Sequence, residues 1–322
     1  MRWPTTFCGA DNDGSLSRLD WRAPPARGRL GAMDWTADRI AAFLNARDLV
    51  CAFDAVRPLA GGYWNAVFRA DTAAGALVVK AYVRVMPGTL FPNLPEAEAA
   101  ALVRLRGLGV APDPVGFWPD EGVLVYRYVP GAPWDGDVAA VAALLRRKAA
   151  ADPAGFRAVP VTAEGMLATG ARMLADCAPD DMAARLGRLR PAPQRAPALD
   201  RLSLIHTDIG AGNLIGRGAG LRLIDWQCPA AGDAAEDAAS FLSPAFQILN
   251  HRPPLAAAAR ADFLAALDDP AMEQRLAVLE PAHAWRMATY CLRRAQTAPD
   301  SAVRARYAAA LAAEFDRLEG WR

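Results

Sequence analysis

Lysine is almost absent from this sequence of 322 residues. Of its 36 basic residues only Lys80 and Lys148 are lysines, and the others are arginines. The net charge at pH 7 is +1, so the basic and acidic residues nearly balance. A chain with so little excess positive charge is not expected to bind nucleic acid or an anionic membrane surface.

Paired cysteines and long apolar runs are also missing. The five cysteines lie far apart, without a CxxC pair or a histidine at metal-ligand spacing, which is typical of a reducing compartment and excludes a zinc site of that kind. No stretch approaches the 18 or more apolar residues that cross a bilayer, and the N-terminal residues contain no continuous apolar run of a secretory signal. We therefore expect no membrane association and a cytoplasmic location.

The texture of the sequence divides the chain into three parts. Residues 1–32 mix proline, glycine, arginine and aspartate without a sustained period, which predicts a poorly ordered N-terminal extension. Residues 33–130 are rich in short β-like runs, and residues 131–322 are mainly helical, apart from a β-rich island at 202–226. The pattern predicts an α+β fold with a small β-rich N-lobe (33–130) and a larger, mainly helical C-lobe (131–322).

The individual elements follow from hydrophobic periodicity. A helix begins around residues 34–36, where the first periodic segment starts after a helix-start signal. Alternating or continuous apolar runs predict strands at 64–70, 76–83, 114–118 and 122–129. Apolar residues at helical spacing predict helices at 95–107, 137–149, 162–177, 234–249, 256–267, 271–295 and 301–318.

The most specific chemical pattern lies in the β-rich island. His206-Thr207-Asp208 is followed by Asn213, and Asp225 comes twelve residues later within an apolar run. Phosphoryl transfer requires a carboxylate that accepts the hydroxyl proton, and hard oxygen ligands that hold Mg²⁺ against the phosphates. This spacing supplies all of these groups from one loop and the hairpin after it. The alternative is a polar hairpin turn in which Asp and Gly serve only the backbone conformation.

A second pattern upstream has the order of a clamp for ATP phosphates. Gly61-Gly62 lies between two predicted strands, Lys80 stands in the next apolar strand, and Glu98 lies on the helix that follows. In such a clamp the lysine holds phosphates and a helix carboxylate orients the lysine. Glu96 is also available, but Glu98 is followed by leucines at i+4 and i+7, which indicates an inward face. Solvated glutamates and a simple glycine turn remain the alternative interpretation.

The scarcity of lysine adds weight to Lys80. An ammonium group is a compact point charge, whereas a guanidinium is a wide fork, so a tight phosphate site selects lysine even in an arginine-rich chain. Lys148, in the run Arg146-Arg147-Lys148, is interpreted as a lysine that occurs by chance on a solvated helix face. Chance is therefore the alternative explanation for Lys80 as well.

These residues resemble the aminoglycoside phosphotransferase and choline kinase family over roughly residues 55–245. The resemblance implies a two-lobed protein-kinase-like fold that binds ATP and Mg²⁺ between its lobes and phosphorylates the hydroxyl of a small molecule. The motifs that carry it are Gly61-Gly62-x-x-Asn65-x-Val67-Phe68, Lys80, Glu98, Leu124–Gly131, His206-x-Asp208 with Asn213, and Ile224-Asp225-Trp226 followed by Gly232-Asp233 and Asp237.

Roles follow from the matching positions. Asp208 is expected to be the catalytic base, with His206 beside it in the same motif, and Asn213 and Asp225 are expected to bind Mg²⁺. The residues expected to bind ATP are the glycine-loop residues Gly61, Gly62 and Asn65, the phosphate anchor Lys80 with Glu98, and the adenine-binding hinge Arg127, Tyr128 and Val129. The resemblance thus implies that the N-lobe (33–130) binds nucleotide and that the C-lobe (131–322) contains the catalytic loop and the acceptor site.

The sequence also departs from the family. Glycine commonly stands at the position of Thr207 and often at that of Gln227, so the geometry of both loops is in question. The lysine of eukaryotic-type protein kinases two residues after the base is missing, and no Ala-Pro-Glu motif follows, which favours a small-molecule acceptor over a protein.

The acceptor itself is not specified by these motifs, and amino alcohols, thiamine, amino sugars, other sugars and aminoglycosides all remain candidates. The carboxylates Asp233, Glu236 and Asp237 with the aromatic residues Trp226 and Trp285 are consistent with a cationic acceptor. Equally, Asp237 can cap a helix or brace the catalytic loop, and both tryptophans can belong to the core. A nucleotide-binding protein without turnover is the alternative to an enzyme, and a protein kinase is a more distant one.

Overall fold

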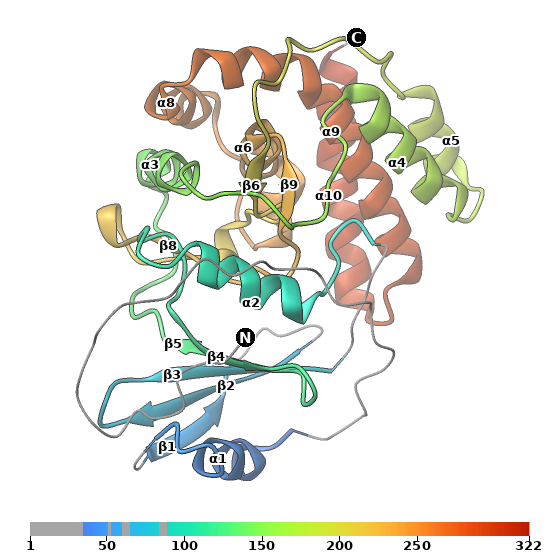
Figure 1. Cartoon of the computed structure of the whole chain (residues 1–322). Helices are drawn as coiled ribbons and strands as arrows, with labels where there is room; N and C mark the ends of the chain where they lie inside the picture. The colour runs from blue at the N-terminus through green and yellow to red at the C-terminus, as the bar shows by residue number, and fades with distance from the viewer. Residues whose placement is uncertain (1–34, 51–52, 60–64, 84–88, 322) are drawn as a thin grey trace. The chain divides into compact units, whose positions relative to one another are not determined.

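The computed structural model describes residues 35–50, 53–59, 65–83 and 89–321, and the chain forms two compact units (Figure 1). The first unit contains the described residues up to Pro130 together with Ile224–Cys228. The second unit contains Gly131–Leu223 and the residues from Pro229 onward. The predicted extension, residues 1–32, lies outside the described residues.

The first unit is built on one antiparallel sheet. Its strand order is β1-β2-β3-β5-β4, so β3 is the central strand, and all six of its residues are buried. Each strand is hydrogen-bonded in antiparallel register to its neighbours, and Lys80 on β3 lies opposite Val67 on β2 and Leu124 on β5. The strands are β1 (Phe53–Pro58), β2 (Asn65–Thr72), β3 (Leu77–Tyr82), β4 (Pro114–Trp118) and β5 (Val123–Arg127).

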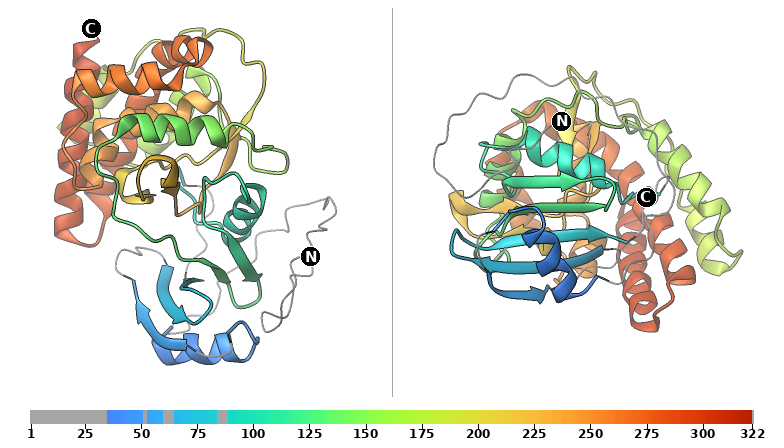
Figure 2. Two further views of the ribbon diagram at one scale, coloured as in Figure 1. Left: turned by 90° about the vertical axis from the view of Figure 1, so that its left-hand side faces the viewer. Right: turned by 60° about the horizontal axis from the view of Figure 1, so that its bottom comes forward.

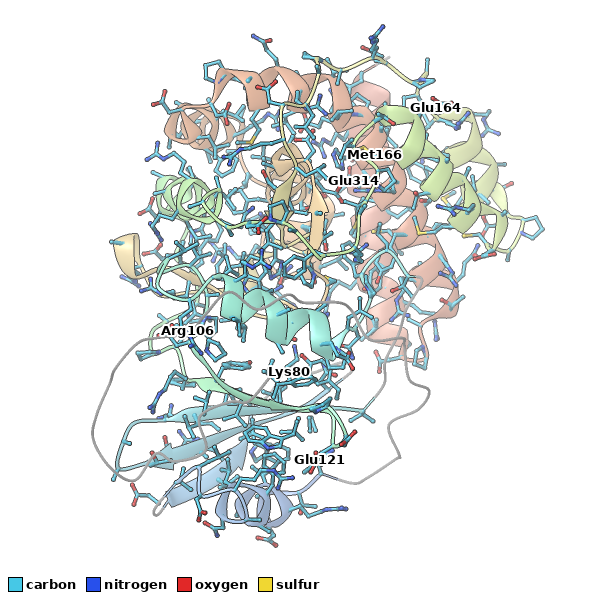
Figure 3. All side chains as sticks on the ribbon, in the orientation of Figure 1. Lys80, Arg106, Glu121, Glu164, Met166 and Glu314 are labelled. Atoms are coloured by element: carbon cyan, nitrogen blue, oxygen red, sulfur yellow. The ribbon has the colours of Figure 1, made fainter. Side chains whose placement is uncertain are left out.

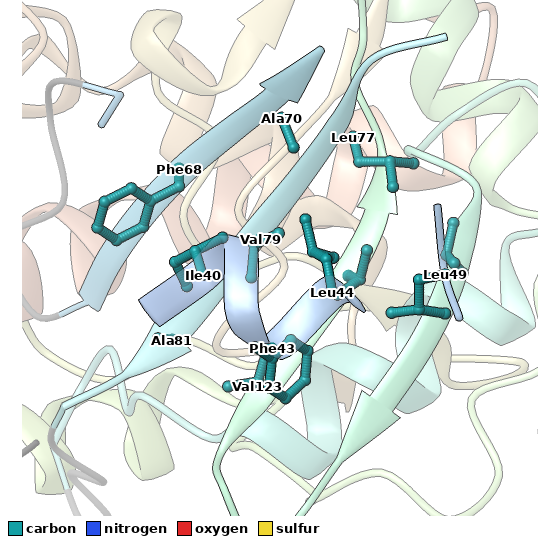
Figure 4. Close-up of a cluster of buried hydrophobic side chains, with 12 residues drawn as sticks. Ile40, Phe43, Leu44, Leu49, Phe68, Ala70, Leu77, Val79, Ala81 and Val123 are labelled. Carbon is teal, nitrogen blue, oxygen red and sulfur yellow. The ribbon is translucent and has the colours of Figure 1, made fainter. Parts of the chain in front are cut away.

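One face of this sheet is covered by helix α1 (Ala37–Asn45), as Figure 4 shows. The side chain of Thr36 accepts a hydrogen bond from the backbone N–H of Arg39 and so caps the helix. Apolar side chains of α1, including Ile40 and Leu44, pack against alternate residues of β3, including Val79. Because side chains alternate across a strand, this arrangement turns Lys80 to the other face.

The other face of the sheet packs against helix α2 (Pro95–Arg104), on the opposite side from α1 (Figure 1). Pro95 starts the helix, a position where its missing N–H costs nothing. Glu98 and Leu102 of α2 are buried on this side. Lys80 of the sheet and the buried carboxylate Glu98 of α2 therefore point toward each other between the sheet and the helix.

The second unit is mainly helical, and its centre is the long helix α9, which packs against α4, α6 and α10. In both views of Figure 2 the two longest helices, drawn in orange to red, lie side by side. The helices are α3 (Val138–Lys148), α4 (Ala163–Ala175), α5 (Asp181–Arg188), α6 (Ala234–Leu242), α7 (Pro244–Leu249), α8 (Ala257–Leu267), α9 (Pro270–Thr297) and α10 (Ser301–Gly320).

Two short antiparallel strand pairs hold the loop at residues 206–213. Strand β6 leads into this loop and pairs with β9, whereas β7 leaves it and pairs with β8. Their bounds are β6 (Ser203–Ile205), β7 (Leu214–Ile215), β8 (Arg222–Leu223) and β9 (Ala230–Gly232), with 3₁₀ turns η1 (Ala211–Asn213) and η2 (Gly218–Gly220).

The α+β composition is as predicted, but several elements differ from the sequence expectation, including β9, which lies beyond the predicted β-rich island at 202–226. The helix predicted at 234–249 is two helices, because Ser243 caps α7 and Pro244 starts it. Strand β1 and helix α5 were not predicted. Described β1 residues are largely exposed and α5 buries only Leu186, so neither has a clear apolar period.

Candidate active site

Lys80, which is labelled in Figure 3, belongs to a charged cluster within the first unit. Its Nζ donates to Glu98 Oε2 at 2.6 Å and to Asp225 Oδ1 at 2.5 Å. The hydroxyl of Tyr82, two residues along β3 on the same face, also donates to Glu98. Of the two glutamates left open by the sequence, the structure brings Glu98 to Lys80.

The electrostatics of this cluster keep Lys80 charged. Burial alone lowers the pKa of Lys80, but the carboxylates of Asp225 and Glu98 more than compensate and raise it above its ordinary value. The side chain of Lys80 is 4% exposed and that of Glu98 1%, whereas that of Asp225 is 36% exposed. The cluster is thus a buried ammonium with one buried and one accessible carboxylate.

A hydrogen-bonded frame supports the segment that contains Asp225. Asn65 and Asn93 exchange side-chain hydrogen bonds at 2.8 and 3.1 Å, and Asn65 Nδ2 also donates to Gln227 Oε1 at 3.4 Å. The carbonyl of Gln227 accepts the N–H of Leu94, just before α2. Asn65 was expected to bind the cofactor, but its buried amide is engaged in this frame. Gln227, at a position where the family often has glycine, is part of the same frame.

The predicted hinge lies at the end of β5, and its first backbone donors are already engaged. The N–H of Arg127 donates to the carbonyl of Asp113, and the N–H of Tyr128 donates to that of Ala76. A hydrogen bond to adenine would therefore use other backbone atoms of this segment, such as those of Val129. Gly61 and Gly62 lie outside the described residues.

In the second unit, Asp237 on α6 holds the loop that contains Asp208. Both carboxylate oxygens of Asp237 accept the N–H of His206, at 3.0 and 3.1 Å, and its Oδ1 also accepts the N–H of Thr207 at 2.9 Å. His206 Nδ1 accepts the N–H of Asp208 at 3.2 Å. His206 is completely buried and Asp208 is partly exposed. The imidazole therefore shapes the loop, and within His206-Thr207-Asp208 only Asp208 is reached by solvent.

Thr207 takes a backbone conformation that glycine adopts more easily. Its φ is +70°, in the left-handed region, which is unfavourable for a β-branched residue by roughly 1–3 kcal/mol. Besides its bond to Asp237, its carbonyl accepts the hydroxyl of Ser240, also on α6, at 3.3 Å. This conformation explains why glycine is common here in the family, and helix α6 holds threonine in it. Asp225, with φ of +64°, is another non-glycine residue in this region.

Asn250, at the end of α7, supports the far side of the loop. Its Oδ1 accepts the N–H of Gly212 at 2.9 Å. A Cβ at Gly210 would lie 2.1 Å from Asn250 Nδ2, so a larger residue here would displace the Asn250 side chain. Asn213 Nδ2 donates to the carbonyl of Asp208 at 3.0 Å, which leaves its side-chain oxygen as the atom available for a cation.

Asp225 in the first unit and Asn213 in the second each have a side-chain oxygen of the kind that binds Mg²⁺. Mg²⁺ is usually bound by one or two side-chain oxygen ligands, with substrate phosphates and water completing its shell. Asp225 and Asn213 are partly exposed and have oxygen atoms suited to this role. Within the described residues there is no group of three or more His, Cys, Asp or Glu side chains that could hold a metal ion.

The structure corrects the interpretation of the acidic and aromatic residues as a cationic pocket. Each carboxylate of this group is buried and paired: Asp233 with Arg275, Glu236 with Arg286, and Asp237 with Lys148. Trp226 and Trp285 are fully buried core residues. None of the five side chains is available to an acceptor, and the preference for a cationic acceptor loses its support.

Lys148 is not on a solvated helix face, as the sequence indicated. It ends α3, is 2% exposed and is bonded to Asp237. Asn93 and Asn250 were not predicted as parts of the site, because a single asparagine in a loop has no distinguishing pattern. For Lys148 a signal existed, since it shares with Lys80 the rarity of lysine in this chain.

Comparison with known proteins identifies the family of this chain. Residues 55–279 match the phosphotransferase enzyme family, and the chain belongs to this family. A segment of 55 residues is 49% identical to the thiamine kinase of Escherichia coli O1:K1, covering 17% of this chain. The match spans about a fifth of that enzyme, 19% of its length.

Solved structures share the fold at low sequence identity. A choline/ethanolamine kinase family protein from Mesorhizobium loti superposes with a TM-score of 0.61 at 17% identity, over 88% of this chain and 93% of that one. The choline kinase of Streptococcus pneumoniae gives 0.60 at 16%, over 87% and 99%. Spectinomycin phosphotransferase in complex with ADP and spectinomycin gives 0.59 at 12%, over 89% and 95%. The predicted family and two-lobed protein-kinase-like fold are confirmed. No helix within the described ranges is long and apolar enough to span a membrane.

Proposed function

We propose that this protein is an ATP-dependent, Mg²⁺-requiring phosphotransferase that phosphorylates the hydroxyl of a small molecule. The observation that supports it most is the pairing of Lys80 with both Glu98 and Asp225, at 2.6 and 2.5 Å. A buried ammonium between a buried and an accessible carboxylate is the arrangement expected of a phosphate anchor beside a metal ligand.

In this proposal each residue has one task. Lys80, oriented by Glu98, binds ATP phosphates through its point charge. Asp225 and Asn213 would hold Mg²⁺, which neutralises negative charge on the phosphates when bound. Asp208 accepts the proton of the acceptor hydroxyl as the hydroxyl oxygen attacks the γ-phosphorus; the bond from the γ-phosphorus to the β,γ-bridging oxygen breaks, and ADP leaves. His206 positions Asp208 through the hydrogen bond from the Asp208 N–H.

The acceptor class is kept broad. The short match to thiamine kinase makes thiamine one candidate, and the structural neighbours add choline, ethanolamine, spectinomycin and aminoglycosides. Because Asp233, Glu236 and Asp237 are engaged in buried ion pairs, neither cationic nor neutral acceptors are favoured, and both are tested.

The test is ADP release from MgATP with each of these compounds, followed by mass spectrometry of the acceptor. Asp208→Asn is the matched control, since it keeps shape and hydrogen bonding and removes the proton acceptor. The proposal predicts one or more phosphorylated compounds with the unaltered chain and none with the variant. Binding of MgATP without any phosphorylated product would identify a nucleotide-binding protein without turnover, and phosphate on added proteins would identify a protein kinase.

A further inference from the structure

The second lysine of the chain is connected to the loop that contains Asp208. We propose that Lys148 is a positioning residue, which fixes Asp237 and strand β6 and thereby holds the backbone of His206 and Thr207 in place. This inference deepens the proposed function, on which its kinetic part rests.

The contacts of Lys148 join three elements of the second unit. Its Nζ donates to the carbonyl of Leu204 on β6 at 2.6 Å and lies 3.0 Å from Asp237 Oδ2 on α6. The side chains of Lys148 and Asp237 are 2% and 1% exposed. One ammonium at the end of α3 is therefore bonded on one side to the strand that enters the loop and on the other to the carboxylate that holds the loop.

Asp237 depends on this charge. Its oxygens accept backbone N–H groups of His206 and Thr207, which carry only partial charge. A buried carboxylate without a full counter-charge is strongly destabilising, and the usual responses are protonation or movement toward water. Either response would weaken the bonds to the loop, because a protonated oxygen is a poorer acceptor.

The loop needs support at this position. Thr207 stands in the left-handed region, and such a conformation persists only when its surroundings determine it. The amide held by Asp237 belongs to this residue, and Asp208 is the next residue in the chain. A compact ammonium reaches a carbonyl and a carboxylate at once, which a planar guanidinium matches less well. This requirement explains a second lysine in a chain that otherwise uses arginine.

The adjacent residue of α6 offers a control. Glu236 is also buried and forms an ion pair of 2.7 Å with Arg286, with side chains that are 4% and 7% exposed. Arg286 comes from α9 and also contacts His283. Replacing Arg286 deprives a buried carboxylate of α6, Glu236, of its counter-ion. It leaves Asp237, the carboxylate that holds the loop, unchanged.

The experiment compares Lys148→Met with Arg286→Met in the full chain. Steady-state kinetics use MgATP and an acceptor that the unaltered chain phosphorylates, or water as the acceptor if none is found. We expect Lys148→Met to lower kcat at least about 30-fold and to keep the KM for ATP within about threefold, because it disturbs only the transition state. Arg286→Met is expected to keep kcat within about threefold of the unaltered chain.

Hydrogen exchange provides a readout that does not depend on activity. In Lys148→Met the amides of His206 and Thr207 should exchange at least about tenfold faster than in Arg286→Met. If the unaltered chain shows no transfer or hydrolysis, the proposed function fails while this measurement still decides the role of Lys148. If a methionine variant does not fold, Lys148→Gln and Arg286→Gln replace the pair, because a glutamine amide can still donate hydrogen bonds without the charge.

Two results would overturn the inference. One is a folded Lys148 variant whose kcat equals that of the matched Arg286 variant. The other is equal exchange of the two loop amides in both variants. In either case Lys148 would be a stabilising ion pair only.

Discussion

The two lysines of this chain occupy similar surroundings in different units, yet the two sites differ in one respect. Both ammonium groups are nearly inaccessible, and each lies within 3.0 Å of a carboxylate. Beside Lys80 this carboxylate is part of a predicted catalytic segment, and beside Lys148 it is hydrogen-bonded to one. The carboxylate beside Lys80 is Asp225, whose side chain is 36% exposed, whereas the one beside Lys148 is Asp237, at 1%.

This difference separates an open site at Lys80 with Asp225, which is the proposed ligand site, from a closed site at Lys148 with Asp237, which is the proposed structural support. At Lys80 the ammonium group lies beside the accessible carboxylate of Asp225. We therefore expect that phosphates and a cation can be added to this cluster. At Lys148 every charge is satisfied within the protein, and the bonds of Asp237 are directed at backbone N–H groups. We infer that changes at the open site affect nucleotide binding, and that changes around the closed site affect turnover.

The largest expected effect follows from Asp208→Asn, which lies in the loop supported by the closed site. The amide cannot accept the hydroxyl proton, so kcat should fall by about 10²–10⁴-fold while affinity for MgATP changes little. Initial-rate kinetics with calorimetric titration of MgATP measure both quantities. A variant that keeps more than about a tenth of the turnover would remove Asp208 from the role of general base.

Asp225→Ala should show the reverse pattern, because it removes the accessible carboxylate of the open site. Without an anionic ligand for Mg²⁺, affinity for MgATP is expected to drop at least about tenfold, and the advantage of MgATP over metal-free ATP should disappear. Calorimetry with and without Mg²⁺ tests this expectation. Unchanged affinity for MgATP would make Asp225 a turn residue that only pairs with Lys80.

Lys80→Arg examines whether the open site needs a point charge. Glu98 and Asp225 lie within 2.6 Å of the ammonium, and a guanidinium fork does not fit the same space. Activity should fall at least about tenfold, nearly as far as in Lys80→Ala. Normal activity of the arginine variant would show that the rarity of lysine has no functional meaning here.

The smallest effect concerns stability in the closed network of the second unit. Burial, together with the positive charges of Arg286 and Arg317, holds the pKa of His283 well below its ordinary value of 6.5. The unfolded chain therefore binds a proton at His283 more readily than the folded chain does. The neutral histidine favours the folded state above pH 6.5, and this contribution to stability is lost as the pH falls below that value.

His283→Gln should remove this dependence, since glutamine is similar in size and does not titrate. Between pH 6.5 and 5, denaturant unfolding should show a loss of stability about 1–2 kcal/mol larger in the unaltered chain than in the variant. At pH 7.5 kcat should be the same in both. Parallel pH profiles of stability would mean that His283 is accessible to protons in the folded protein.

The sequence predicted the open site better than the closed one, for physical reasons. Lys80, Glu98 and Asp225 belong to local patterns with known spacing, and the structure brings them together. Lys148 ends the run Arg146-Arg147-Lys148, and a helix end with three basic residues looks solvated when its neighbours are unknown. Its burial depends on β6 and α6, which come more than fifty residues later in the chain.

Other differences also arise from tertiary contacts. The carboxylates after Asp225 were considered for ligand binding because unpaired acids attract cations, but their partners Arg275 and Arg286 lie on α9, far along the sequence. Strand β1 forms only as the edge of a sheet whose other strands follow it. Such pairings add stability that local periodicity does not record.

The most direct test of the central claim is a calorimetric titration of MgATP into Lys80→Met and Lys148→Met, each first shown to be folded. The account predicts binding at least about tenfold weaker in Lys80→Met and within about threefold of the unaltered chain in Lys148→Met. Equal losses in the two variants, or full affinity in Lys80→Met, would contradict the distinction between the open and the closed lysine site.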